Sequence, residues 1–128
     1  MIEPCQPKQA NDIVKKCLHY GKYVYHVTSI KNYDKIMNCG LRPKSNIKNR
    51  NYDLRIYFIV SKDNVKERIR DIINNVYGNV KDCVILKIEL PIDSINVYKD
   101  DTVNGDYSFY TYSSIPKEYI HRVRLEKI

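Results

Sequence analysis

The stretch Lys22-Tyr23-Val24-Tyr25-His26-Val27-Thr28-Ser29 decides how the rest of this chain is arranged. Its β-branched and aromatic residues predict a strand. Successive side chains of a strand point to opposite faces, so Val24, His26 and Thr28 share one face and the tyrosines share the other. A histidine and a threonine therefore project side by side near the end of this strand.

A short helix is predicted directly after the strand. Ser29 is placed to cap it, because a serine hydroxyl can accept a hydrogen bond from the backbone of the first helical turn. An apolar stripe at helical spacing follows in residues 30–39. Gly40 predicts the helix end, since glycine readily takes the left-handed conformation of a C-cap, and Leu41 is expected to pack back on the helix.

The remaining chain alternates between helical and strand patterns. Further strands are predicted over 54–60, 83–90, 95–98, 107–112 and 122–128. Helices are predicted over 8–20 and from Val65 to Val76, with Ser61 as a cap and Gly78 as the stop, and a helical turn over 115–121 begins with Pro116. The polar segment 43–53 predicts a long loop.

Composition and charge place the chain among folded, basic proteins. It has 128 residues, 43% of them hydrophobic, which predicts one domain, 1–128, with residues 1–21 as a helix-bearing N-terminal extension. The net charge is +7, which can attract a nucleic acid, a dinucleotide or an acidic protein, or can belong to a solvated lysine-rich surface. With no signal peptide or long apolar run, the expected location is cytoplasmic, without membrane contact.

The four cysteines predict neither zinc nor disulfides. Cys5, Cys17, Cys39 and Cys83 lie far apart, and the three histidines do not cluster near them, so metal-ligand spacing is absent from the sequence. The last three fall within apolar patterns and are expected to be reduced core residues.

Three short motifs carry a family resemblance. Tyr25-His26-Val27-Thr28-Ser29, followed by Gly40-Leu41-Arg42-Pro43, resembles the opening of the ADP-ribosyltransferase fold. Arg55–Ser61 is similar to that family's second core strand, and Ser114–Ile120 to its Ile-Pro-x-Glu-x-Ile step. The group includes poly-ADP-ribose polymerases, DNA-modifying ADP-ribosyltransferase toxins and RNA 2′-phosphotransferases, and small phage-borne proteins of this type share the arrangement. The resemblance implies an α+β fold with a split, mostly antiparallel sheet core and short flanking helices.

The resemblance also implies a set of NAD-binding residues. In the family, the strand histidine hydrogen-bonds the adenosine-side ribose of NAD and the neighbouring hydroxyl helps hold the nicotinamide half. The resemblance gives these roles to His26 and Thr28. The second-strand tyrosine that stacks on nicotinamide corresponds to Tyr57. Arg42 and Arg55, with Lys44, are cations that could neutralise the pyrophosphate. Each residue also has a purely structural alternative. The histidine can be a hydrogen-bonded residue at a strand end, the tyrosine can be a packing residue, and the cations can be solvated on the surface.

The catalytic carboxylate is where the chain departs from the family pattern. Many members carry a glutamate before the Ile-Pro step, and the carboxylate at that place here is Asp106, one methylene shorter. Tyr107 or Tyr110 could instead occupy the position, leaving no carboxylate. Glu118 is more simply a helix-start residue. In the phosphotransferase alternative, several basic side chains surround an RNA phosphate. His26 with Arg42, Arg55 and His121 resembles that set only loosely.

Two functions follow as hypotheses. The first is an ADP-ribosyltransferase-like protein that binds NAD as substrate, with His26 and Asp106 as catalytic candidates and a nucleic acid or protein as acceptor. The second is a catalytically inactive phage-type binding protein that uses the same fold and a basic surface to hold a nucleic acid or protein partner. The sequence leaves open the acceptor and the oligomeric state.

Overall fold

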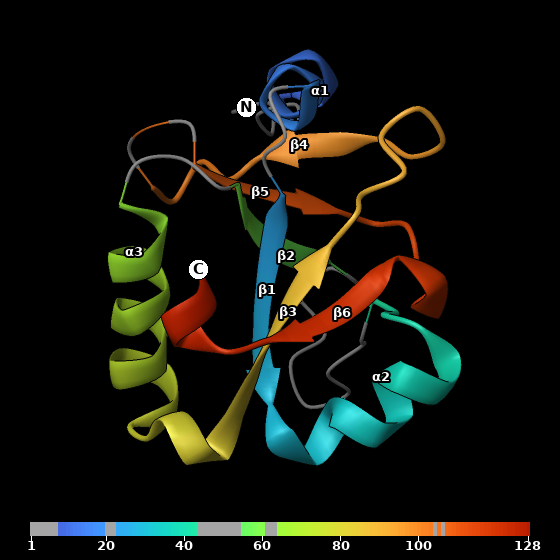
Figure 1. The fold of residues 1–128 in the computed structure, drawn as a ribbon. Helices are drawn as coiled ribbons and strands as arrows, with labels where there is room; N and C mark the ends of the chain where they lie inside the picture. The colour runs from blue at the N-terminus through green and yellow to red at the C-terminus, as the bar shows by residue number, and fades with distance from the viewer. Residues whose placement is uncertain (1–7, 20–22, 44–54, 61–63, 104, 106) are drawn as a thin grey trace, which may run out of the picture.

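An antiparallel sheet forms the centre of the molecule (Figure 1). The computed structural model describes residues 8–19, 23–43, 55–60, 64–103, 105 and 107–128. Within these ranges the sheet has six strands in the order β4-β5-β2-β1-β3-β6, all paired antiparallel. The strands are β1 (Val24–Ser29), β2 (Ile56–Val60), β3 (Cys83–Ile88), β4 (Val97–Lys99), β5 (Ser108–Thr111) and β6 (Ile120–Val123). The predicted α+β class and antiparallel core are confirmed.

The two central strands, β1 and β2, are paired over a short stretch and then separate. β1 pairs with β3 along its whole length, from Val24↔Ile88 to Ser29↔Cys83. Its pairing with β2 covers Val24↔Val60 and Tyr25↔Ile59 and then stops. The sheet therefore opens on one side of β1 at the next residue, His26.

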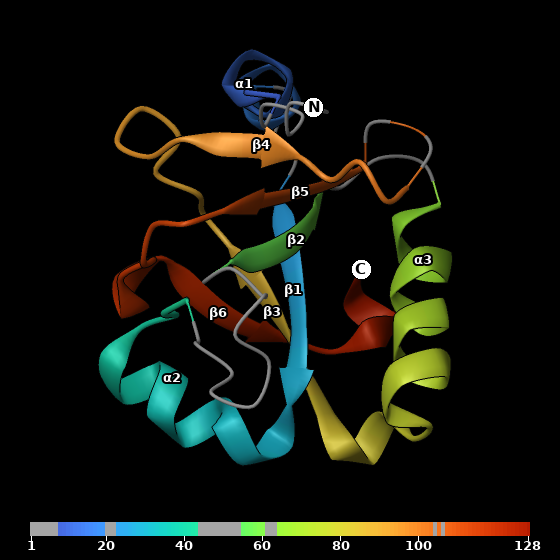
Figure 2. The same ribbon diagram turned by 180° about the vertical axis from the view of Figure 1, so that it is seen from behind.

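Helices cover both faces of the sheet (Figures 1 and 2). The chain begins with α1 (Asn11–His19) beside the β4 edge. After β1, a 3-10 turn η1 (Ile30–Asn32) leads into α2 (Tyr33–Cys39), and Ser29 caps that turn by accepting a hydrogen bond from the Lys31 amide. After β2 comes α3 (Val65–Ile72), continued by one π-helical turn, η2 (Ile73–Tyr77). A 3-10 turn η3 (Val80–Asp82) precedes β3, and the turn η4 (Lys117–Tyr119) precedes β6.

Two apolar clusters, one on each face, follow from the two-residue period of the strands. Val24, Phe58 and Leu86 lie in the cluster that Ile36 of α2 and Val14 of α1 complete. The alternate residues Tyr25, Ile59 and Ile85 lie in the cluster that Ile69 of α3 completes. Because alternating residues separate cleanly between the clusters, the predicted face assignment of β1 is confirmed.

The segment after α2 joins two parts of the chain that lie far apart in sequence. Gly40 has a φ of +80° and its amide donates to the Ile36 carbonyl at 2.7 Å, so it ends the helix as expected. Leu41 and Ile115 then exchange two backbone hydrogen bonds, each 2.8 Å long. The Gly-Leu step and the Ile-Pro step of the sequence are therefore neighbours in space.

The structure corrects two expectations about where apolar patterns lead. The helical spacing of Val65, Ile69, Ile72, Ile73 and Val76 predicts a single apolar stripe, but Val76 is 68% exposed, because the π-helical turn adds a residue per turn and rotates it off that stripe. The final strand was expected to reach Ile128, but β6 ends at Val123 and a 3-10 turn η5 (Leu125–Lys127) follows. The chain turns because Leu125 and Ile128 pack against the α3 cluster instead of extending the sheet.

The cysteines are only partly core residues. Cys83 is buried as expected and Cys17 is half-buried, whereas Cys39 at the end of α2 is exposed, contrary to the apolar pattern around it. All three are free thiols, and Cys5 lies outside the described residues. Across the part of the chain that the structure describes, each helix is too short or too polar to span a bilayer.

Candidate functional site

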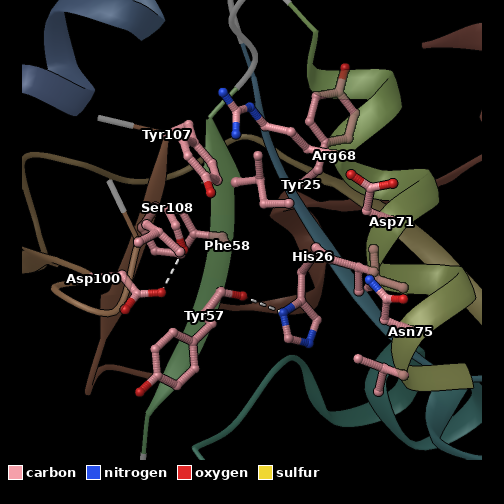
Figure 3. A pocket seen from close by; sticks show the side chains of 15 residues that line it. Tyr25, His26, Tyr57, Phe58, Arg68, Asp71, Asn75, Asp100, Tyr107 and Ser108 are labelled. Carbon is pink, nitrogen blue, oxygen red and sulfur yellow. Dashed lines mark hydrogen bonds between the residues drawn. The ribbon is translucent and has the colours of Figure 1, made fainter. Parts of the chain in front are cut away.

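His26 lies where β1 and β2 separate. Its Nδ1 is 2.5 Å from the backbone carbonyl oxygen of Tyr57, the contact drawn as a dashed line in Figure 3. A carbonyl can only accept, so Nδ1 carries the proton and donates it. In the neutral imidazole, Nε2 is then the acceptor nitrogen. The sheet backbone thus fixes both the orientation and the tautomer of this ring.

Two pockets meet at His26. The first has a volume of about 460 Å³ and lies between α3 and strands β1, β2 and β5 (Figure 3). Its lining includes His26 and Tyr57 together with Arg68 and Asp71 of α3. The second has a volume of about 350 Å³ and lies between α2 and the same central strands. Its lining includes His26 together with the other predicted site residues Thr28, Arg42 and Arg55.

The residues predicted to line one cleft are therefore divided between two pockets, with His26 in both. His26 and Thr28 do line one pocket, as the strand period indicated. Tyr57 lines the other pocket, again with His26, so Tyr57 and Thr28 meet through the histidine and not within one cavity. The physical reason is that Tyr57 follows the opposite parity along β2 and projects from the α3 face, whereas Thr28 projects from the α2 face.

Thr28 and Tyr57 each make a side-chain hydrogen bond. Thr28 is buried, and its Oγ1 accepts a hydrogen bond of 3.2 Å from Asn32 Nδ2. Tyr57 is 43% exposed, and its hydroxyl accepts a hydrogen bond of 3.3 Å from Arg55 Nη1. The centroid of the Tyr57 ring lies 5.5 Å from that of Tyr110 on β5. Thr28 therefore offers a hydroxyl held at a fixed place, and Tyr57 offers an accessible aromatic ring.

A carboxylate that was not among the residues predicted from the sequence borders the first pocket. Asp100 follows β4, is 7% exposed and accepts hydrogen bonds from the Thr102 amide (3.0 Å), the Thr102 hydroxyl (2.6 Å) and the Ser108 hydroxyl (2.8 Å). Burial by itself would raise the pKa of Asp100, but these hydrogen bonds outweigh it and hold the pKa below its ordinary value. The Asp-x-Thr spacing in the turn after β4 is the signal that indicates such a capping carboxylate.

The other predicted residues divide between the pockets and the remaining surface. Asp106, the catalytic candidate, and Lys44 lie outside the described residues. Tyr107 lines the first pocket, where the guanidinium of Arg68 lies 3.4 Å from the centroid of its ring. Glu118 and His121 line neither pocket and are exposed. The Nε2 atom of His121 lies 3.8 Å from Oε1 of Glu89. Because His121 lines neither pocket, the residues that could surround an RNA phosphate in the phosphotransferase alternative are His26, Arg42 and Arg55.

A metal-binding group is not part of this site as described. Among the residues that the structure places, no three histidine, cysteine or carboxylate side chains gather closely enough to hold a metal ion. Searches of protein-family models and of curated proteins found no match to this chain.

Proposed function

We propose that this protein binds NAD at the split between β1 and β2 and is an ADP-ribosyltransferase-like protein whose acceptor is a nucleic acid or a protein. The observation that carries the proposal is the position of His26. Its ring is fixed by the Tyr57 carbonyl at the point where the sheet opens, and a pocket adjoins it on each side. The pocket volumes of about 460 and 350 Å³ fall within the roughly 300–1,000 Å³ typical of cofactor sites.

In this proposal, the fixed tautomer sets how His26 contacts the ligand. With Nδ1 donating to the backbone, Nε2 accepts a hydrogen bond from a ribose hydroxyl of NAD. The exposed ring of Tyr57 stacks on nicotinamide, and the Thr28 hydroxyl helps to hold the nicotinamide half. Arg42 and Arg55 are the cations in the second pocket that neutralise the pyrophosphate.

The transfer step breaks the bond between nicotinamide and the ribose C1′. Nicotinamide leaves with the bonding electron pair, positive charge develops on the ribose, and a nucleophile of the acceptor bonds to C1′ and loses its proton. A transition state of this kind needs a nearby carboxylate. Asp106 is the candidate from the sequence. Asp100 is the alternative, and it acts through Ser108, whose hydroxyl it holds at the edge of the first pocket.

Calorimetric titration with NAD tests the binding step. We expect His26→Ala to weaken NAD affinity by about 1–3 kcal/mol, since it leaves a ribose hydroxyl without its partner. Tyr57→Ala should also weaken binding, whereas Tyr57→Phe keeps the stacking face and should have little effect. His121→Ala is the matched control, because His121 is exposed and lines neither pocket. No NAD binding to the wild-type protein at millimolar concentration would overturn the proposal.

The second candidate is a catalytically inactive binding protein with the same fold. It is favoured by the state of Asp100, since both of its carboxylate oxygens already accept hydrogen bonds from Thr102 and Ser108. Measuring nicotinamide release separates the two. If the protein is an enzyme whose carboxylate is Asp106, Asp106→Asn abolishes release and spares NAD affinity. If NAD binds but no nicotinamide is released with any acceptor offered, the inactive binding protein is supported.

A further inference from the structure

Three tyrosines stand directly opposite one another on three neighbouring strands. Tyr98 of β4 pairs with Tyr110 of β5, and Tyr110 pairs with Tyr57 of β2. Residues opposite one another in an antiparallel sheet share a face, so the three rings form a row across the strands. The ring centroids are 5.6 Å apart between Tyr98 and Tyr110 and 5.5 Å apart between Tyr110 and Tyr57.

A fourth tyrosine and an arginine widen this row into a surface. Tyr112 directly follows β5 and Arg55 directly precedes β2, and both contact the ring of Tyr110. The Tyr112 centroid lies 5.6 Å from those of Tyr98 and Tyr110. The Arg55 guanidinium lies 4.3 Å from the Tyr110 centroid and 5.6 Å from that of Tyr112. We call Arg55 and these four tyrosines the tyrosine platform.

The outer rings of the platform are accessible while its centre is packed. Tyr57 is 43% and Tyr112 is 40% exposed, whereas Tyr110 in the middle is 4% exposed. The helix α3 covers a different part of the same face, where it packs with Tyr25 and Ile59. The rings are thus held in place by one another and by the sheet, with two of them presented to solvent.

The chemistry of the platform matches nucleobases better than another apolar surface. Its accessible groups are phenol rings beside a guanidinium, whereas the exposed aliphatic side chains among the described residues, Ile30, Val76 and Val80, belong to other elements. Aromatic side chains on the open face of an antiparallel sheet stack unpaired bases, and arginine adds cation–π and phosphate contacts. The net charge of +7 favours a polyanion.

We propose that the tyrosine platform binds single-stranded nucleic acid, with bases stacked on Tyr57 and Tyr112. Two of the platform residues, Arg55 and Tyr57, also line the second and the first pocket, whereas Tyr98, Tyr110 and Tyr112 line neither, so Tyr112 tests the platform separately from NAD binding. Tyr57 belongs to both the platform and the first pocket, so a strand bound on the platform ends beside His26. Duplex nucleic acid does not fit, because its bases are already stacked.

Fluorescence anisotropy with labelled 12-mers of dT and of U tests the proposal, and comparing the two shows whether DNA or RNA is preferred. We expect Tyr112→Leu to weaken binding by about tenfold and Tyr112→Phe to retain it, since phenylalanine keeps the stacking face. Tyr119→Leu is the matched control, because Tyr119 is 38% exposed on η4 and away from the platform. Circular dichroism should show that all three variants are folded.

Intrinsic fluorescence gives a second readout. The chain has twelve tyrosines and no tryptophan, so bases stacked on the platform should quench its tyrosine emission, less so in Tyr112→Leu. NAD affinity should be the same in Tyr112→Leu as in the wild type, which separates this inference from the proposed function. The inference is overturned if neither oligonucleotide binds, if a duplex binds as well as the single strands, or if Tyr112→Leu and Tyr119→Leu behave alike.

Discussion

At the scale of single residues, one hydrogen bond that His26 donates to the backbone sets the state of its ring. A strand histidine facing solvent samples both tautomers and several rotamers, and neither is set by sequence. The Tyr57 carbonyl removes that freedom by requiring a proton on Nδ1. The ring nitrogen that carries the proton is therefore defined by the strand opposite and not by a neighbour in sequence.

Asp100 is the residue whose hydrogen bonds predict a measurable stability effect. Asp100→Ala removes the acceptor for three hydrogen bonds and leaves the buried Ser108 hydroxyl without this partner. We expect the free energy of unfolding in urea at pH 7 to fall by about 2 kcal/mol or more. Asp101→Ala is the control, since Asp101 is the exposed neighbour, and it should change stability little.

The pH dependence of this effect has a definite sign. Hydrogen bonds hold the pKa of Asp100 in the folded protein below the ordinary value of 3.8. Its stabilising contribution is therefore fully present above that value and is lost as the pH falls through the lower folded pKa. The difference in stability between wild type and Asp100→Ala should accordingly shrink under strongly acidic conditions. A difference that stays constant down to acid unfolding would contradict the role of the charge.

At the scale of elements, the ends of helices show the interplay of local rules and packing. Gly40 and Gly78 both end helices with positive φ, of +80° and +76°, as their places in the sequence indicate. Between α3 and Gly78 the chain forms a π-helical turn, which the sequence pattern did not predict. A helical stripe drawn at 3.6 residues per turn therefore fails beyond Ile73, which is buried.

The two glycines form a matched pair for a stability test. An alanine at either site meets a positive φ that side chains rarely adopt, which costs on the order of 1–3 kcal/mol. At Gly40 the added Cβ would also lie 2.6 Å from the Ile115 carbonyl oxygen, whereas at Gly78 it meets nothing within 4 Å. We expect the urea midpoint to fall further for Gly40→Ala than for Gly78→Ala. Equal midpoints would mean that the contact with the Ile115 segment relaxes freely.

At the scale of the whole molecule, thiols on separate elements report on how the chain packs. Cys17 is in α1, Cys39 ends α2 and Cys83 begins β3. We expect a thiol reagent to find four thiols in the denatured, unreduced protein. In the native protein Cys39 should react early, because it is exposed, and Cys83 late, because burial limits access and raises the pKa of its thiol. A disulfide, or zinc at one equivalent, would contradict the prediction.

The sequence by itself determined the local pieces of this protein. The alternation around His26 set the two faces of β1, the glycine at position 40 set the end of α2, and the apolar run from Cys83 indicated the strand β3. These features depend on the backbone preferences of a few adjacent residues, so they can be read without knowing what packs on them. The ADP-ribosyltransferase resemblance and the NAD site remain predictions.

Tertiary structure alone decided which residues meet. The carbonyl that fixes His26, the carboxylate of Asp100 beside Ser108 and the row of tyrosines depend on strand pairing, which joins residues that are not neighbours in the sequence. The exit of the chain after Val123 was decided in the same way, by the burial of Leu125 and Ile128. Such contacts depend on pairing and burial across the sheet, and local sequence patterns do not encode the partner.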